Sequence, residues 1–232
     1  MDNQISIVYS FSFKDKAPKE FGILLDKETL SLIPKEPPAV PPWAELSRNR
    51  CKDCSLDERT FRYCPVAYNL VAIAEQFKDC FAYEPAGVTV TTEERTYSKE
   101  TIIQEGLGSL LGIIMATSGC PVMEYFKPMA RFHLPFATLT ETIFRISSVY
   151  LISQYFLKQE ARLPVLDLER INDIYLKVGE LNRDFSQRLA EAAKKDASIN
   201  ALVNLDCFAS MIPLATGETF AELKRYFAAY LK

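Results

Sequence analysis

The sequence predicts an α+β fold, with a small N-terminal antiparallel sheet packed on a mainly helical C-terminal bundle. Three observations carry this prediction. The first third alternates apolar and polar residues, a proline-rich stretch interrupts it, and the remainder repeats its apolar residues at helical spacing. With 232 residues, of which 48% are hydrophobic and 25% charged, the chain can bury one sizeable core. We therefore expect residues 1–232 to form a single domain.

The N-terminal region, residues 1–33, is predicted to be a β-hairpin. Residues 4–12 alternate weakly between apolar and polar side chains, which is typical of a half-buried strand. Phe21–Leu25 is the expected partner strand, and Thr29–Ile33 is a candidate third short strand. Residues 34–42 hold five prolines, so this segment is expected to be an extended connector that leads into the next part of the chain.

Residues 43–97 are predicted to contain a cysteine-bearing loop, a helix and a strand. The helix is expected to begin at Cys64-Pro65, because proline suits the first helical position, where its missing N–H has no intrahelical partner. Val88–Thr96 is rich in valine and threonine and is the expected strand.

Residues 98–232 are predicted to be helical, with Ser98 as the first N-cap. Thr138 and Glu141 form a capping-box pattern for a helix that is expected to reach about Glu160. Asp167 is a candidate cap of the following helix. Two more helices are predicted near the C-terminus, at Ser198–Met211 and Glu218–Leu231, with Pro213 and Gly217 separating them.

Composition narrows the functional classes. The balance of 27 Lys and Arg against 30 Asp and Glu gives a net charge of −3, so we expect no nucleic-acid binding. The longest apolar stretch, Ile102–Ala116, is too short to span a membrane, and the N-terminus has no secretory signal, so a cytoplasmic location without membrane association is expected. A single histidine, His133, excludes mechanisms that need two. Protein partners and self-association are left open.

Four of the six cysteines form the principal candidate site. Cys51 and Cys54 form a Cys-x-x-Cys pair, Cys64 follows ten residues later, and Cys120 precedes a second proline. Each Cys-Pro unit is predicted to start a helix, where free backbone N–H groups and the helix dipole stabilise a thiolate. Four thiolates suit a closed zinc site of structural or regulatory role. Zinc is therefore the first expected cofactor.

Three alternatives remain open for the same residues. A 4Fe-4S cluster on the four cysteines would make the chain a redox or sensor protein. A thiol enzyme would use Cys120 as nucleophile and His133 as base. The thiols can also be free and merely buried. The sequence does not decide whether the chain is an enzyme, and Cys80 and Cys207, expected on helices, are interpreted as core residues.

Several motifs resemble those of an uncharacterised bacterial family, a domain of unknown function. They are the cysteine pair followed by Cys-Pro-Val-Ala, then Ser-Gly-Cys-Pro at Cys120, Met-Ala-Arg-Phe-His-Leu-Pro-Phe-Ala at 129–137, and the segment that begins at Asp196. The resemblance spans nearly the whole chain, although Ser55 stands where the family often has proline. It implies a bacterial, single-domain, cytoplasmic protein and no particular activity, and it draws attention to Arg131, Asp196 and Asn200.

Overall fold

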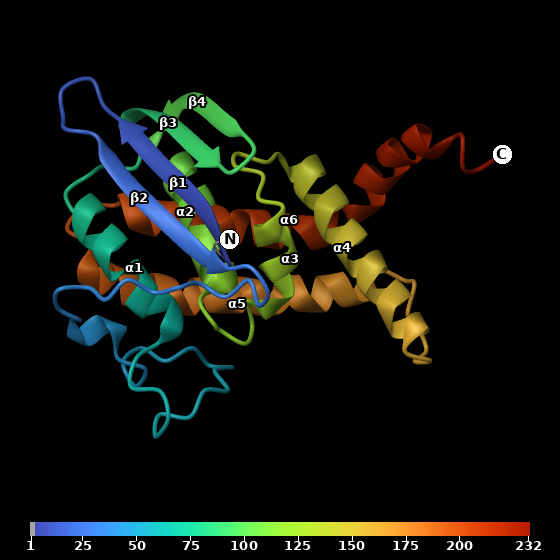
Figure 1. Ribbon diagram of the computed structural model, residues 1–232, viewed down its shortest axis with the longest axis horizontal. Helices are drawn as coiled ribbons and strands as arrows, with labels where there is room; N and C mark the ends of the chain where they lie inside the picture. Colours follow the sequence, from blue (N-terminus) through green and yellow to red (C-terminus); the bar gives the residue numbers. More distant parts are fainter. Residues whose placement is uncertain (1–2) are drawn as a thin grey trace.

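The computed structural model describes residues 3–232, apart from the side chains of Phe208 and of residues 213–218. Its N-terminal half contains one four-stranded antiparallel sheet in the order β2-β1-β3-β4. The strands are β1 (Gln4–Ser12), β2 (Lys19–Asp26), β3 (Pro85–Thr92) and β4 (Thr96–Ile102). Figure 1 shows the sheet as the blue-to-green layer, with helices behind and below it. The α+β prediction is therefore confirmed.

The helices are α1 (Pro65–Phe77), α2 (Ile103–Thr117), α3 (Lys127–Arg131), α4 (Leu139–Gln159), α5 (Glu169–Ala192) and α6 (Ala197–Lys224), with short 3₁₀ turns at Pro42–Ala44, Glu124–Phe126 and Arg225–Phe227. Helix α2 runs behind the sheet, and α5 and α6 lie side by side as long, roughly parallel rods (Figure 1). No helix in the described part of the chain is both long enough and apolar enough to cross a bilayer.

The strand alternation places one face of the sheet in the core. Ile7, Tyr9 and Phe11 of β1 are at most 2% exposed, and the intervening side chains face outward. This face packs on α2 at close range, because Gly106 lies beneath Phe11. A Cβ atom at Gly106 would stand 2.6 Å from the Phe11 ring and 2.8 Å from Val88, so glycine is what allows the helix to approach the sheet.

Three sequence predictions in the first half are wrong. Val88–Thr96 is not one strand, because β3 ends at Thr92 and the chain turns there, with the Thr92 N–H bonded to the Arg95 carbonyl, before β4 begins at Thr96. Thr29–Ile33 is not a strand, because the Asp26 carboxylate accepts hydrogen bonds from Glu28 and Thr29 and closes a turn there, which leaves one isolated bridge between Leu25 and Leu32. Ser98 does not cap a helix. It lies in β4 opposite Thr89, with the two hydroxyls 3.1 Å apart, so the helical region begins at Ile103 rather than at residue 98.

Helix boundaries further along agree better with the sequence. The capping box at Thr138 and Glu141 is present, and α4 ends at Gln159. Asp167 does not provide the N-cap side chain of α5, although its carboxylate accepts a 3.2 Å hydrogen bond from the Glu169 N–H. The prediction of two separate C-terminal helices is wrong: α6 continues through position 213, and its axis bends over the C-terminal half (Figure 1).

Candidate functional site

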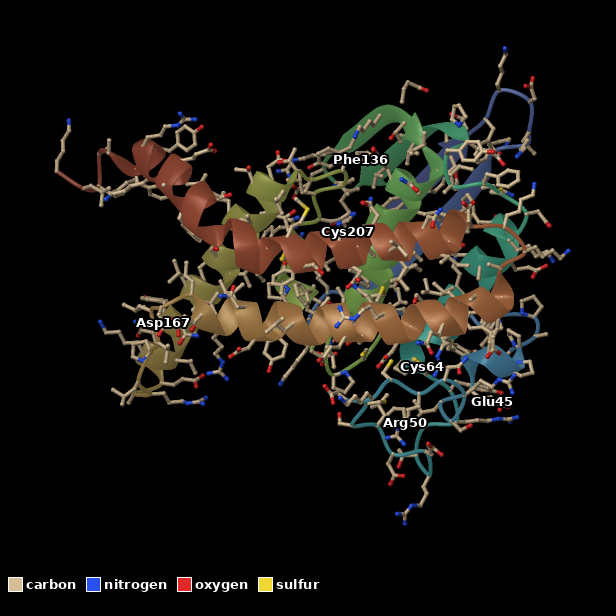
Figure 2. The ribbon with its side chains drawn as sticks, turned by 180° about the vertical axis from the view of Figure 1, so that it is seen from behind. Glu45, Arg50, Cys64, Phe136, Asp167 and Cys207 are labelled. Atoms are coloured by element: carbon tan, nitrogen blue, oxygen red, sulfur yellow. The ribbon has the colours of Figure 1, made fainter. Side chains whose placement is uncertain are left out.

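The four predicted cysteine ligands line one small pocket. Cys51 and Cys54 come from the irregular loop before α1, Cys64 is the N-cap residue of α1, and Cys120 lies in the turn after α2. The pocket has a volume of about 30 Å³ and is closed on one side by α5. Figure 2 shows Cys64 below α5, on the side of the loop that carries Arg50. Three segments far apart in the sequence therefore meet at these thiols.

Backbone N–H groups point at two of the sulfurs. The N–H groups of Val66 and Ala67 in the first turn of α1 lower the pKa of the Cys64 thiol, although this side chain makes no capping hydrogen bond. The N–H groups of Val122 and Met123 lower the pKa of the Cys120 thiol in the same way. The sequence predicted that the second Cys-Pro unit would start an α-helix, and this prediction is wrong. The chain makes a turn there instead, in which the Met123 N–H bonds the Cys120 carbonyl at 2.9 Å. The turn nevertheless presents the same kind of donors as a helix N-terminus.

Burial keeps the thiols of Cys51, Cys64 and Cys120 protonated in the absence of a cation. It raises the pKa of Cys51 to about 12 and that of Cys120 to about 11, and it also raises the pKa of Cys64. Another cysteine of the pocket raises the pKa of each of these three thiols further, because neighbouring thiolates repel each other. A free thiol with such a pKa is a poor nucleophile at neutral pH.

The side chains are not in a coordinating arrangement. Within the described part of the chain, no group of three or more His, Cys, Asp or Glu side chains is placed to hold a metal ion. The pocket thus gathers the four thiols without bringing them to bonding distance of a common centre.

Two residues of α5 fix the cysteine loop. Arg188 is 1% exposed, and its guanidinium donates to the carbonyl oxygens of Trp43 at 2.7 Å, Glu45 at 2.6 Å and Asn49 at 3.1 Å. Asp184 lines the pocket, and its carboxylate accepts from the Lys52 N–H, between the two cysteines of the pair, at 2.8 Å. The positive charge of Arg188 lowers the pKa of both Cys51 and Cys64, against the larger effect of burial.

Arg188 was not among the residues predicted from the sequence, although its position on the apolar face of α5 was a signal for it. The apolar stripe of α5 includes Leu181, Phe185 and Leu189, and position 188 falls on this buried face, three residues after Phe185. A charged residue in that position is either paired or bonded to backbone oxygens. Asn182 occupies the same face and is 2% exposed.

His133 belongs to a different part of the molecule. Its Nε2 lies 2.5 Å from the Tyr9 hydroxyl, which in turn is 2.8 Å from the Ser109 hydroxyl. Burial lowers the pKa of His133 to about 3, with a smaller contribution from the charge of Arg145, so the ring is neutral at pH 7. His133 lines a second, larger cavity, whereas Cys120 lines the cysteine pocket. The geometry therefore does not favour a pair of Cys120 as nucleophile and His133 as base.

The three polar residues suggested by the family resemblance line neither of the two pockets. Asp196 accepts the Ala82 N–H at 2.9 Å and the Asn200 side-chain amide at 2.8 Å, which ties the start of α6 to the segment before β3. Arg131 lies over the ring of Phe132, 5.6 Å from its centroid. These contacts are structural.

The two remaining cysteines differ from their predicted placement. Cys80 is buried, as expected, but lies in the loop after α1 rather than on a helix. Cys207 lies on α6 and is exposed, so it is not a core residue. Neither lines the cysteine pocket.

Comparison with protein families gives one match. The model of a domain of unknown function, DUF6901, covers residues 7–228, and the chain therefore belongs to this family. No curated protein and no solved structure matches the chain.

Proposed function

We propose that this DUF6901 member is a zinc-binding protein in which Cys51, Cys54, Cys64 and Cys120 hold one structural ion. The observation that carries the proposal is that all four cysteines line the same pocket of about 30 Å³. The ion would pin the irregular loop before α1 to the turn after α2. Since the chain segments on either side of this contact are distant in sequence, binding energy at the pocket would be folding energy for the domain.

The donor set and its surroundings fit zinc. Four thiolates form a closed tetrahedral shell with Zn–S distances of about 2.3 Å. The N–H groups that point at Cys64 and Cys120 stabilise negative charge on sulfur, as expected around thiolate ligands. A zinc ion with four thiolates retains an excess of negative charge, and buried Arg188 supplies a compensating positive charge.

Binding would change both the ionisation and the positions of the thiols. A divalent cation favours deprotonation of its ligands and removes the mutual repulsion that raises their pKa values. Because the four thiols are not placed to hold an ion in common, binding would also draw their sulfurs closer together.

A 4Fe-4S cluster on the same four cysteines is the second candidate, and it would make the protein an electron-transfer or redox-sensing protein.

Zinc content and affinity, measured on single-cysteine variants, test the proposal. We expect about one zinc per wild-type chain after purification without chelator, measured by elemental analysis. Cys64→Ser and Cys120→Ser should each weaken zinc binding at least 100-fold in competition with a chromogenic chelator. Cys207→Ser is the matched control, because it removes an exposed thiol outside the pocket and should leave affinity unchanged.

Unfolding experiments separate a structural ion from an adventitious one. Removal of zinc should lower the thermal midpoint of the wild type and of Cys207→Ser equally, and should have little effect on Cys64→Ser. A wild-type chain that binds no zinc, or that has the same midpoint with and without it, would overturn the proposal. Iron with visible absorption would favour the cluster instead.

A further inference from the structure

The second cavity is large, and its lining is mainly apolar. It has a volume of about 460 Å³, within the range of small-molecule sites, and lies among α2, α3, α4, α5, α6 and the segment between α3 and α4. Three methionines, Met115, Met123 and Met129, contribute flexible apolar side chains, together with Phe126 and Phe136. This cavity is distinct from the cysteine pocket, because the two have no lining residue in common.

One charge in the lining has no counter-charge. The charged residues that line the cavity are Lys99, Glu105 and Arg145. Lys99 and Glu105 form an ion pair at 2.9 Å, whereas no carboxylate lies within ion-pair distance of Arg145 in the described residues. Glu141, one turn earlier on α4, acts on Arg145 only at longer range, because its carboxylate is occupied by the N-cap of that helix.

The Arg145 guanidinium is fixed and only partly used. Its Nη2 donates to the carbonyl oxygens of Met129 at 2.8 Å and Phe132 at 2.9 Å, which hold it in place. Its Nη1 and Nε donors have no partner among the described residues. Bidentate binding would need Nη2, which the two carbonyl groups occupy, but the free Nη1 and Nε groups can each donate a charge-assisted hydrogen bond to a carboxylate oxygen.

A second polar group in the lining also lacks a partner. Asn182 is 2% exposed, and its amide Oδ1 makes no hydrogen bond within the described part of the protein. A buried acceptor without a donor destabilises the protein unless a hydroxyl or N–H group reaches it. This acceptor is independent of Arg145, since the two residues lie on different helices.

We infer that this cavity binds an amphipathic monocarboxylic acid, with the carboxylate on Arg145 and the apolar body among the methionines and phenylalanines. Asn182 would accept a hydrogen bond from a hydroxyl or N–H group of such a ligand. The Tyr9 hydroxyl bonds both the neutral His133 ring and the Ser109 hydroxyl. His133 and Ser109 line the cavity but add no charge that would compete for the carboxylate.

Octanoate, 1-octanol and octylamine are suitable probes, because they share one chain and differ in the charge of the head group. We expect the wild-type protein as purified to bind octanoate at least 10-fold more tightly than octylamine in calorimetric titration. Arg145→Gln should weaken octanoate at least 10-fold and leave 1-octanol nearly unchanged. Arg131→Gln is the matched control, since it removes the same charge from a residue outside the cavity and should not alter octanoate binding.

Gly112→Leu provides a second test in case Arg145→Gln fails to fold. A Cβ atom at position 112 meets only the Leu205 side chain, at 3.9 Å, so a leucine there can fold and fill part of the cavity. It should abolish binding of octanoate and 1-octanol alike. The inference is overturned if wild-type protein does not bind octanoate at millimolar concentration, if Gly112→Leu still binds it, or if Arg131→Gln weakens binding as much as Arg145→Gln.

Discussion

Arg188→Met should be among the most destabilising single substitutions in the chain. The guanidinium is fully buried and holds three backbone carbonyl groups of the cysteine loop, at 2.6–3.1 Å. A hydrogen bond from a charged donor contributes about 1.5–3 kcal/mol, and the carbonyls of Trp43, Glu45 and Asn49 would lose their donor. The substitution also removes the cost of keeping a charge away from water, and this offsets part of the loss. The net destabilisation is about 3–5 kcal/mol.

Urea unfolding followed by tryptophan fluorescence measures this effect directly. Trp43 is the single tryptophan of the sequence, is 7% exposed, and is one of the residues that Arg188 holds. With a urea dependence of about 2–3 kcal/mol per molar, the midpoint should fall by about 1–2.5 M. The wild type and each variant are purified and dialysed in the same way, so that their metal content can be compared.

Arg183→Met is the matched control on the same helix. Arg183 is exposed and pairs with Asp206 at 3.6 Å, so its loss should change stability by no more than about 0.5 kcal/mol. If Arg188→Met shifts the midpoint by less than about 0.3 M, or no more than Arg183→Met, the role assigned to Arg188 as the anchor of the cysteine loop is refuted.

Further predictions concern α2, His133 and the free thiols. Gly106→Ala should destabilise the fold by about 1–3 kcal/mol in urea unfolding, because its Cβ would overlap the β1 side chains, whereas Gly112→Ala should be neutral or stabilise it by up to about 1 kcal/mol. Between pH 6.5 and about 3 the unfolded chain protonates His133 and the folded chain does not, so wild-type stability falls as pH is lowered. From pH 7 to pH 4, the wild type should therefore lose about 2–3 kcal/mol more unfolding free energy than His133→Gln, and an equal loss would contradict a neutral, buried ring. In zinc-free protein, iodoacetamide should modify Cys120 much more slowly at pH 7 than exposed Cys207, with a rate that rises until about pH 11, as mass spectrometry of the labelled peptides would show. Fast modification of Cys120 at pH 7 would instead support the thiol-enzyme alternative.

Local sequence signals predicted the elements that local interactions determine. The alternation of residues 4–12, the proline after Cys64 and the Thr138 capping box each describe a short-range preference, and each element forms where it was expected. Ser98 failed as a helix cap because pairing with β3, which depends on tertiary contact, is stronger than its local preference. Pro213 failed as a boundary because a helix that packs along a neighbour can continue through a proline.

The candidate sites also differ in how far local sequence predicts them. The Cys-x-x-Cys spacing predicted that Cys51 and Cys54 would lie close together, and the fold adds Cys64 and Cys120 to the same pocket. Whether the four hold a metal ion stays a prediction. The larger cavity was not predictable.

The larger cavity could not be predicted because its two unpartnered polar residues lie far apart along the chain. Arg145 and Asn182 come from different helices, and only the packing of α4 against its neighbours shows that both line one space. A polar residue on an apolar helical stripe was the signal available for Asn182. Nothing in the local sequence around Arg145 distinguishes it from a surface arginine.

X-ray absorption at the zinc K-edge is the decisive test of the proposed four-cysteine site, because it counts the ligand atoms around the ion in the intact protein. We expect a first shell of four sulfur atoms at about 2.3 Å in the wild type, and three sulfurs with one lighter ligand in Cys120→Ser if that variant retains zinc. A shell dominated by nitrogen or oxygen, or a wild-type spectrum that Cys64→Ser and Cys120→Ser leave unchanged, would contradict it.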